Sequence, residues 1–321
     1  MKKILPCCIA LSLLFQYSLG QSNLKNNFAN VDNYVKKLGS LTSLNVSVIA
    51  DTLTRNFSEK EDKARAIFFW IATNIALDGK AIKQNDHGKS LPENVVQFRK
   101  STPLGFSLLV QEMCSQANIR CLSVDGYVKS RAEEINEKAD EFNHSWNVVQ
   151  LGKSPEEWYY LDAARASGFL DNKMSVFTPS FTSEYFFADK NLFNLDHYPD
   201  NNAWQLGPSG PKSIKDFYSL PVFLTGAYTF GLGKPKPATG LIKTSVKKPV
   251  SFNFPFNGTV IKSIELIIGD GRKQRKPEAM NFSTYAGIVS FNYQFKIPDE
   301  FPATIRINGK DVLAYNILVT E

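Results

Sequence analysis

His144 and Asp162 are the two residues of this chain whose types and surroundings best fit catalytic chemistry. They lie in residues 143–168, NHSWNVVQLGKSPEEWYYLDAARASG, where two apolar-rich arms flank the turn-forming stretch GKSPE. Pairing the arms about Lys153 predicts a β-hairpin in which His144 faces Asp162 across the two strands. A carboxylate beside an imidazole fixes the tautomer and raises its basicity, so the pair would form a general base that activates a Cys or Ser nucleophile.

The same pairing places other large side chains on the face that carries this pair. It sets Trp146 opposite Tyr160 and Val148 opposite Trp158. Tryptophans in such strands belong to the core more often than to a ligand site, and both interpretations stay open for Trp146. Trp146 and Tyr160 are therefore candidates for the lining of a binding cleft as well as for the core.

The segments before this hairpin are predicted to be mainly helical and to position it. Apolar residues recur at helical spacing within residues 24–57 and again in KARAIFFWIATNIAL, residues 63–77. A polar loop is expected over residues 78–92, a helix over 103–116 and a strand over 119–128. Helices followed by antiparallel strands predict an α+β domain in which the helices pack on one sheet.

The C-terminal part of the chain is predicted to be a separate all-β unit. Residues 178–221 are rich in aromatic residues and proline, which indicates an ordered extension of the α+β domain. The Gly- and Pro-rich residues 231–240 are expected to form a linker, so the first domain would span residues 21–230. Alternating apolar residues over 241–321 predict several short strands, most simply an immunoglobulin-like sandwich.

The first residues, MKKILPCCIALSLLFQYSLG, are predicted to be a bacterial secretory signal peptide. They combine a basic start, a short apolar run and small residues at a plausible cleavage point. Cleavage is expected between Gly20 and Gln21, which would leave a periplasmic, surface-associated or secreted protein. The apolar run is too short for a transmembrane helix and no second run follows it, so no integral membrane segment is expected.

Composition argues against several classes of ligand. The formal net charge is +6, but the basic residues are spread along the chain, which argues against nucleic-acid binding. The basic stretch at residues 270–276 is interpreted as a solvated hairpin tip, with contact to an acidic polymer or membrane surface as the alternative. Neither a metal nor a cofactor is predicted, because no Cys/His spacing indicates zinc and no run of acids indicates calcium. Cys114 and Cys121 would form either a disulfide or two buried small hydrophobic residues.

The order of several motifs along the chain resembles that of transglutaminase-like domains, which have a papain-like fold. The resemblance covers roughly residues 40–222. It includes features similar to the kyphoscoliosis-peptidase-like branch of that superfamily. The matching motifs are Lys63-Ala64-Arg65-Ala66-Ile67 with Trp70-Ile71 and Asn74-Ile75, Gly105-Phe106-Ser107, Asn118-Ile119-Arg120-Cys121, Gly126-Tyr127-Val128-Lys129, His144-Ser145-Trp146-Asn147 and Trp158-Tyr159-Tyr160-Leu161-Asp162-Ala163, and those of the branch are Tyr185-Phe186-Phe187, His197-Tyr198-Pro199 and Trp204-Gln205-Leu206.

The resemblance implies a Cys-His-Asp site for peptide hydrolysis or for transamidation at glutamine, with His144 and Asp162 as two of its members. In this family the Cys begins a helix, two residues before the glycine that Gly105 matches, where the helix dipole and the imidazole lower its pKa. That position is Pro103 in this chain. Proline suits a first helical position because its φ is already helical, and Thr102 before it is a good N-cap. The helix is therefore expected to begin in the right place without the thiol.

A prepared base without a nucleophile predicts an exported, catalytically inactive transglutaminase-like protein whose cleft binds or scaffolds a protein, a peptide or a cell-surface polymer. Thr102, Trp146 and Tyr160 are its candidate cleft residues. The alternative is a working peptidase or acyl transferase that uses His144 and Asp162 with an unrecognised nucleophile. Thr102 or Ser101 would serve only with a shifted register, and Cys114 lies roughly 16 Å along the helix. A third possibility is that the β unit carries the function and the larger domain presents it.

Overall fold

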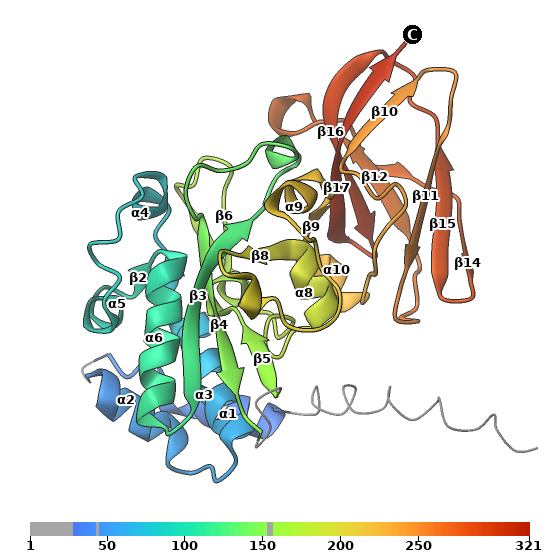
Figure 1. Ribbon diagram of the computed structural model, residues 1–321. Coiled ribbons are helices and arrows are strands. Elements are labelled where there is room, and N and C mark those ends of the chain that lie inside the picture. Colours follow the sequence, from blue (N-terminus) through green and yellow to red (C-terminus); the bar gives the residue numbers. More distant parts are fainter. Residues whose placement is uncertain (1–27, 43–44, 153–156) are drawn as a thin grey trace, which may run out of the picture.

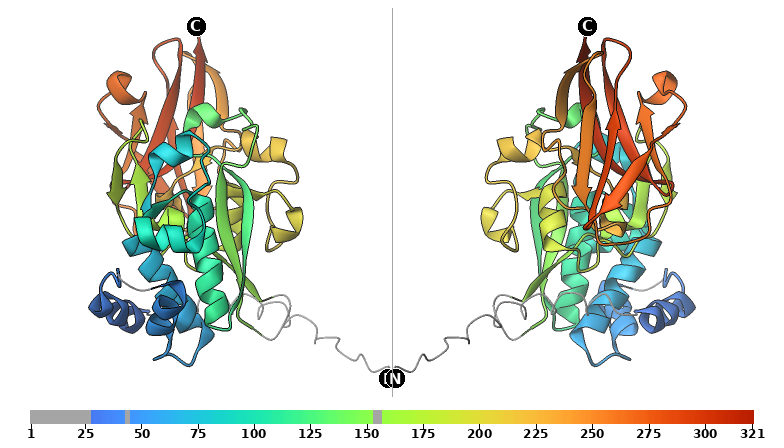
Figure 2. Two further views of the ribbon diagram at one scale, coloured as in Figure 1. Left: turned by 90° about the vertical axis from the view of Figure 1, so that its left-hand side faces the viewer. Right: turned by 90° about the vertical axis from the view of Figure 1, so that its right-hand side faces the viewer.

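The computed structural model describes residues 28–42, 45–152 and 157–321, and the predicted signal peptide lies outside these ranges. The N-terminal helices lie at one end of the molecule and the C-terminal strands at the other (Figures 1 and 2). Among the described residues, no helix is long and apolar enough to span a bilayer.

Three helices form the N-terminal part: α1 (Ala29–Leu38), α2 (Val46–Thr54) and α3 (Lys60–Asn74). The periodicity predicted for α3 is confirmed, since Trp70 and Ile71 are fully buried. Arg65 of α3 donates two hydrogen bonds of 2.8 Å each to the carboxylate of Asp32 in α1. A bidentate pair of this kind fixes geometry as well as charge, so it holds α1 on α3.

The polar loop predicted over residues 78–92 is only partly correct, because α4 (Gly79–Lys83) lies within it. The side chain of Asp78 caps this helix by accepting a hydrogen bond of 3.2 Å from the Ala81 N–H. A helix of about one turn is too short to show an apolar period, so periodicity could not predict it. The helix α5 (Pro92–Phe98) follows, and β1 (Ala76–Leu77) pairs in parallel with β2 (Lys100–Ser101).

The central sheet carries the predicted hairpin. Its strand order is β5-β4-β3-β8, and all neighbours are antiparallel. Helix α6 packs on β3 and β4, as the ribbon shows, and it begins and ends where the sequence predicted (Figure 1). The elements of this layer are α6 (Pro103–Gln116), β3 (Arg120–Val128), β4 (His144–Gln150), β5 (Trp158–Leu161) and β8 (His197–Pro199). This arrangement confirms the α+β domain.

The predicted hairpin register is wrong by two residues. Val148, not Trp146, faces Tyr160, and Trp158 faces Gln150 rather than Val148. An even shift leaves every side chain on its predicted face, so His144 and Asp162 remain on one side as diagonal neighbours. The apolar alternation fixes the face of each arm but not which pairs meet, because every shift by an even number of residues keeps the same faces.

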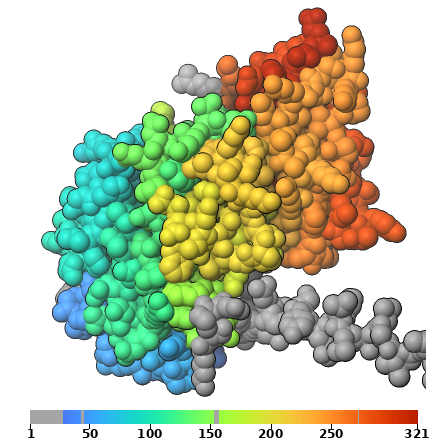
Figure 3. Space-filling view, viewed as in Figure 1, coloured from blue at the N-terminus to red at the C-terminus, as the bar shows by residue number. Residues whose placement is uncertain are grey.

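Short elements join and cover the sheet. A chain segment around α8 and α9 lies between the sheet and the C-terminal strands, coloured yellow in the space-filling view (Figure 3). These elements are η1 (Ala132–Glu134), α7 (Ala163–Ser167), β6 (Gly168–Leu170), β7 (Phe177–Pro179), α8 (Lys190–Asp196), η2 (Asn202–Trp204), α9 (Ile214–Ser219), β9 (Val222–Phe223) and α10 (Thr225–Thr229).

The C-terminal region is all-β, as predicted, and consists of two sheets. One has the order β10-β17-β16-β12-β13 and the other β11-β15-β14. The rings of Phe252 and Tyr315, one from each sheet, lie 5.6 Å apart between centroids. Its strands are β10 (Leu241–Ser245), β11 (Val250–Pro255), β12 (Ile264–Ile268), β13 (Glu278–Ala279), β14 (Phe282–Tyr285), β15 (Ile288–Tyr293), β16 (Asp299–Ile307) and β17 (Lys310–Thr320), with a further turn at η3 (Gly271–Lys273).

The predicted boundary near residue 230 is not a clean break. Strand β9, from the predicted first domain, pairs antiparallel with β17 of the β region. Residues 231–240 are not a free linker either, because Leu232 is buried and Lys236 exchanges backbone hydrogen bonds of 2.7 and 2.8 Å with Asn253. The Gly and Pro content of residues 231–240 predicted only the lack of regular secondary structure. Whether such a segment packs against the protein depends on tertiary contacts.

Candidate active site and cleft

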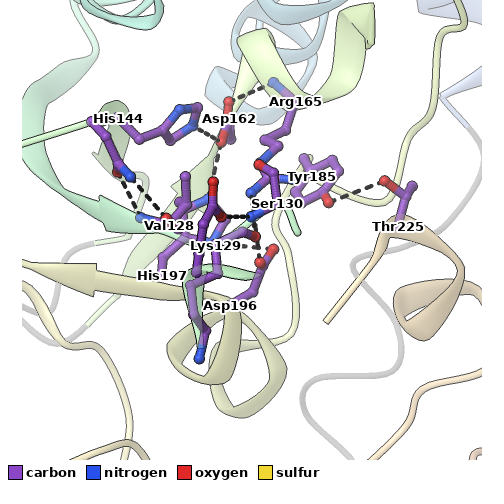
Figure 4. Close-up of polar contacts among 12 residues, drawn as sticks. Val128, Lys129, Ser130, His144, Asp162, Arg165, Tyr185, Asp196, His197 and Thr225 are labelled. Carbon is purple, nitrogen blue, oxygen red and sulfur yellow. Dashed lines mark hydrogen bonds and ion pairs between the residues drawn. The ribbon is translucent and has the colours of Figure 1, made fainter. Parts of the chain in front are cut away.

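Three separate segments bring a carboxylate and two imidazoles together (Figure 4). His144 is the first residue of β4, Asp162 follows β5 and caps α7, and His197 is the first residue of β8. His144 Nε2 lies 2.6 Å from Asp162 Oδ2, and His197 Nε2 lies 3.1 Å from the same oxygen. The predicted pair is therefore in contact, and His197 is a second partner of its carboxylate.

The ionised carboxylate of Asp162 determines which imidazole nitrogen beside it carries a proton. Burial of Asp162 would raise its pKa, but the charge and hydrogen bond of His144 and the hydrogen bond of His197 outweigh burial and hold the pKa far below its usual range. The Arg165 N–H also donates to Asp162 Oδ1 at 2.8 Å. An ionised carboxylate only accepts, so Nε2 is the protonated nitrogen of the neutral His144 ring, whose Nδ1 then presents a lone pair. This is the tautomer that a general base needs.

His197 is a positioning residue within this group. Its ring stacks on Phe193 with the centroids 3.7 Å apart and is fully buried, which lowers its pKa despite the nearby charge of Asp196. Its Nδ1 has no hydrogen-bond partner, although Asp196 Oδ2 lies 3.4 Å away. A neutral ring with Nε2–H donated to Asp162 explains both observations. Asp196 is compensated instead by Arg165 at 3.8 Å.

His144 opens onto a cleft of about 680 Å³ that Pro103 and Thr102 also line. Pro103 is the first residue of α6 and Thr102 is its N-cap, as predicted, but the Thr102 side chain does not cap the helix. Its hydroxyl lies 3.2 Å from Ser90 Oγ and 3.4 Å from His87 Nδ1 instead. The other residues that line the cleft are Ile82, Asn85, His87, Leu104, Asp125, Tyr127, Asp140, Glu141, Phe142, Asn143, Ser145 and Asp200.

The sequence model of the transglutaminase-like superfamily matches residues 48–163, a range that includes Pro103, His144 and Asp162. Residues 48–163 belong to the transglutaminase-like superfamily. The chain is also similar to kyphoscoliosis peptidase from Mus musculus, at 29% identity over 241 residues that cover 72% of this chain and 36% of the relative. The Homo sapiens protein of that name is 29% identical over 258 residues, which cover 75% of this chain and 38% of the relative.

A more distant relative is cytokinesis protein 3 from Schizosaccharomyces pombe. It is 26% identical over 233 residues, which cover 71% of this chain and 25% of that protein. Together these similarities confirm the transglutaminase-like domain and its kyphoscoliosis-peptidase-like branch. This chain spans less than two fifths of the length of the kyphoscoliosis peptidases that it matches.

Two predicted cleft residues of the transglutaminase-like domain are core residues instead. Trp146 and Tyr160 are each 1% exposed, and neither lines the cleft. The Tyr160 hydroxyl accepts a hydrogen bond of 2.6 Å from the Leu206 N–H and donates at 2.7 Å to Asn194 Oδ1. The sheet face that carries Trp146 and Tyr160 was predicted correctly, but the segments around α8 and η2 cover it. The position of these segments depends on contacts between residues distant in sequence.

Sequence reasoning assigned neither His87 nor His197 to the site, although it recognised the motif His197-Tyr198-Pro199. The chain has three histidines, and all of them lie at this site. His87 and His144 line the cleft, and His197 binds Asp162. The rarity of histidine was the available signal, although it could not have shown the contacts.

No thiol from the described residues lines the cleft of the transglutaminase-like domain. Cys114 and Cys121 are both buried and both free, so they behave as the second of the two predicted alternatives. A larger hollow of about 1220 Å³ lies between the segment around α8 and residues 228–239, and none of the predicted site residues lines it.

The cluster of His144, Asp162 and His197 has side chains of the types that bind zinc, and their ligand atoms lie within 4.8 Å of one another. Zinc requires imidazole nitrogens that carry no proton and that point at a common centre. Here both Nε2 atoms point at one carboxylate oxygen as hydrogen-bond donors. The geometry is that of a hydrogen-bonded network, and the absence of a metal stays a prediction.

Proposed function

We propose that this transglutaminase-like domain is a non-catalytic binding or scaffolding module and that Pro103 stands at the position of the family's nucleophile. The observation that carries the proposal is the cleft, in which His144 and Pro103 line the same space. His144 is prepared as a base by Asp162. Proline has neither a nucleophilic atom nor a proton to give, so this base has nothing to activate. The open cleft remains available to a ligand.

The proposal has two further parts. The chain is exported by the signal peptide at its N-terminus, and its partner is a protein, a peptide or a cell-surface polymer. The β region is an immunoglobulin-like sandwich that accompanies the domain. Its strand order supports this, because β12, β16 and β17 share one sheet and β11, β14 and β15 the other, as strands C, F, G and B, D, E do in that fold.

Purified chain is expected to show neither of the two activities that the superfamily suggests. It should not release ammonia from a glutamine-containing peptide in the presence of a primary amine, and it should not cleave peptides. The readouts are coupled ammonia detection and mass spectrometry of a peptide mixture. His144→Ala is the matched control, since a trace activity that survives it comes from a contaminant. Turnover that is lost in His144→Ala would overturn the proposal.

A second candidate function rests on a different chain of contacts in the same cleft. Thr102 Oγ1 lies 3.4 Å from His87 Nδ1, and His87 Nε2 lies 2.9 Å from Asn85 Oδ1. The Asn85 amide is oriented by a 2.6 Å hydrogen bond from its Nδ2 to Glu141 Oε2. His87 therefore donates through Nε2, and its Nδ1 can accept the Thr102 proton. A hydroxyl, an imidazole and an orienting group in this order resemble an activated oxygen nucleophile.

A fluorophosphonate probe distinguishes the two candidates. The binding module predicts no labelling, because Thr102 is only 3% exposed and Ser101, the other hydroxyl considered, does not line the cleft. A working Thr102 nucleophile predicts stoichiometric labelling that disappears in Thr102→Val and falls at least tenfold in His87→Gln. Labelling that persists in Thr102→Val but is lost in Ser101→Ala would instead identify Ser101.

A further inference from the structure

The walls of the cleft are markedly acidic. Four of its lining residues are carboxylates, and Lys and Arg are absent from the described lining: Asp125, Asp140, Glu141 and Asp200. The chain as a whole carries a formal net charge of +6, so this cleft is opposite in sign to the molecule around it. A cleft lined by one sign of charge raises the local concentration of ligands of the other sign.

These carboxylates are free to receive a ligand. All four are exposed, and within the described ranges none of them takes part in an ion pair. Asp125 Oδ1 accepts a hydrogen bond of 2.6 Å from Ser145, and Glu141 Oε2 accepts one from Asn85. Each of these two residues keeps a second oxygen. A neighbouring cation is Lys138, whose Nζ lies 6.0 Å from the Tyr127 ring and which does not line the cleft.

An independent observation at the base of the cleft points to the same kind of ligand. His144 is 8% exposed and lines the cleft, and no described residue bonds its Nδ1. Because Nε2–H is donated to Asp162, Nδ1 presents a lone pair and needs a donor. The bottom of the cleft and its walls therefore both offer hydrogen-bond acceptors, so a complementary ligand must carry several N–H donors.

Aromatic rings complete the lining. Phe142 is 44% exposed and packs edge-on against Tyr127 at 5.5 Å between centroids. Burial, and to a smaller extent the charge of Asp200, raise the pKa of Tyr127. Ring faces next to carboxylates favour an ammonium or guanidinium group with an apolar stem.

We propose that the cleft binds a cationic peptide segment, with a Lys or Arg side chain between the acidic wall and His144 Nδ1. This inference rests on the proposed binding function and names the class of its ligand. A peptide fits the volume, because about 680 Å³ holds a few residues.

The probe is a fluorescein-labelled peptide, Gly-Arg-Lys-Gln-Arg-Lys, which has the sequence of residues 271–276 of this chain. Fluorescence anisotropy at 50 mM salt should show saturable binding that weakens with added salt. The neutral peptide Gly-Gln-Gln-Gln-Gln-Gln and an acidic peptide of equal length should not bind. Binding of the acidic peptide in place of the basic one would overturn the proposal.

Paired variants locate the site. Asp140→Asn combined with Asp200→Asn should weaken binding roughly fivefold to thirtyfold, because two exposed charge contacts are removed. Glu133→Gln combined with Glu137→Gln is the matched control, since both residues are exposed, precede Asp140 by a few residues without lining the cleft, and change the net charge equally. Equal losses in the two double variants would show that the peptide binds by overall charge, which contradicts the proposal. If the peptide-binding test fails, the prediction that the protein shows no turnover is unaffected, and the proposed function stands or falls on that separate measurement.

Discussion

Pro103→Cys is expected to create a reactive thiol in the cleft. At pH 7 an ordinary cysteine is about 3% thiolate, whereas a helix N-terminus and a neighbouring imidazole lower the pKa enough for most of the thiol to ionise. The new cysteine should therefore react with iodoacetamide about tenfold to thirtyfold faster than an ordinary exposed cysteine. Rates are measured by quenched alkylation and intact mass spectrometry, on a background in which Cys114 and Cys121 are buried.

Two controls decide what that reactivity means. Glu137→Cys supplies an exposed cysteine that does not line the cleft, and His144→Ala in the Pro103→Cys background removes the base. If the base acts on the new thiol, reactivity falls toward the level of Glu137→Cys when His144 is lost, and the helix N-terminus accounts for what remains. A Pro103→Cys protein that reacts no faster than Glu137→Cys would show that position 103 is not a nucleophile position, and the proposed origin of the site would be wrong.

Asp162→Ala is expected to reduce the free energy of unfolding by about 3–5 kcal/mol. The carboxylate is completely buried and accepts hydrogen bonds from His144, His197 and the Arg165 N–H, so its removal leaves two buried donors and one partly buried donor without this partner. Asp140→Ala, at an exposed carboxylate, should change stability by less than about 0.5 kcal/mol. Urea unfolding followed by tryptophan fluorescence measures both, and equal effects would contradict the role assigned to the network.

The same network makes the protein less stable in acid. The pKa of Asp162 is lowered in the folded state, so its contribution is present above its ordinary value of 3.8 and is lost as the pH falls below that value. The pKa of His197 is lowered from 6.5, so the unfolded state binds its proton first and stability already falls below pH 6.5. In Asp162→Ala the part of the stability loss that occurs below pH 3.8 should disappear. Measuring the free energy of unfolding as a function of pH tests this.

Local sequence signals determined a large part of the fold. Pro103 and Thr102 predicted the start of α6 correctly. The φ angle of proline suits the first helical position, and threonine is a residue type favoured at the N-cap. Apolar alternation placed His144 and Asp162 on one face of the sheet, since alternate residues of a strand share a face whatever their register. The ordered motifs identified the superfamily, which the comparison confirmed.

Tertiary structure alone decided the remaining features. The strands β4 and β5 pair two residues away from the predicted register, and the covering segments placed Trp146 and Tyr160 in the core rather than in the cleft. His197 and Asp200 reached the site through β8, which pairs with β3 more than sixty residues earlier in the chain. A sequence pattern reports the preference of a residue for a face or a terminus, because that depends on its neighbours in the chain. Which faces meet depends on the packing of distant segments, and at this site that packing determined the acidic wall, the second imidazole and the open cleft.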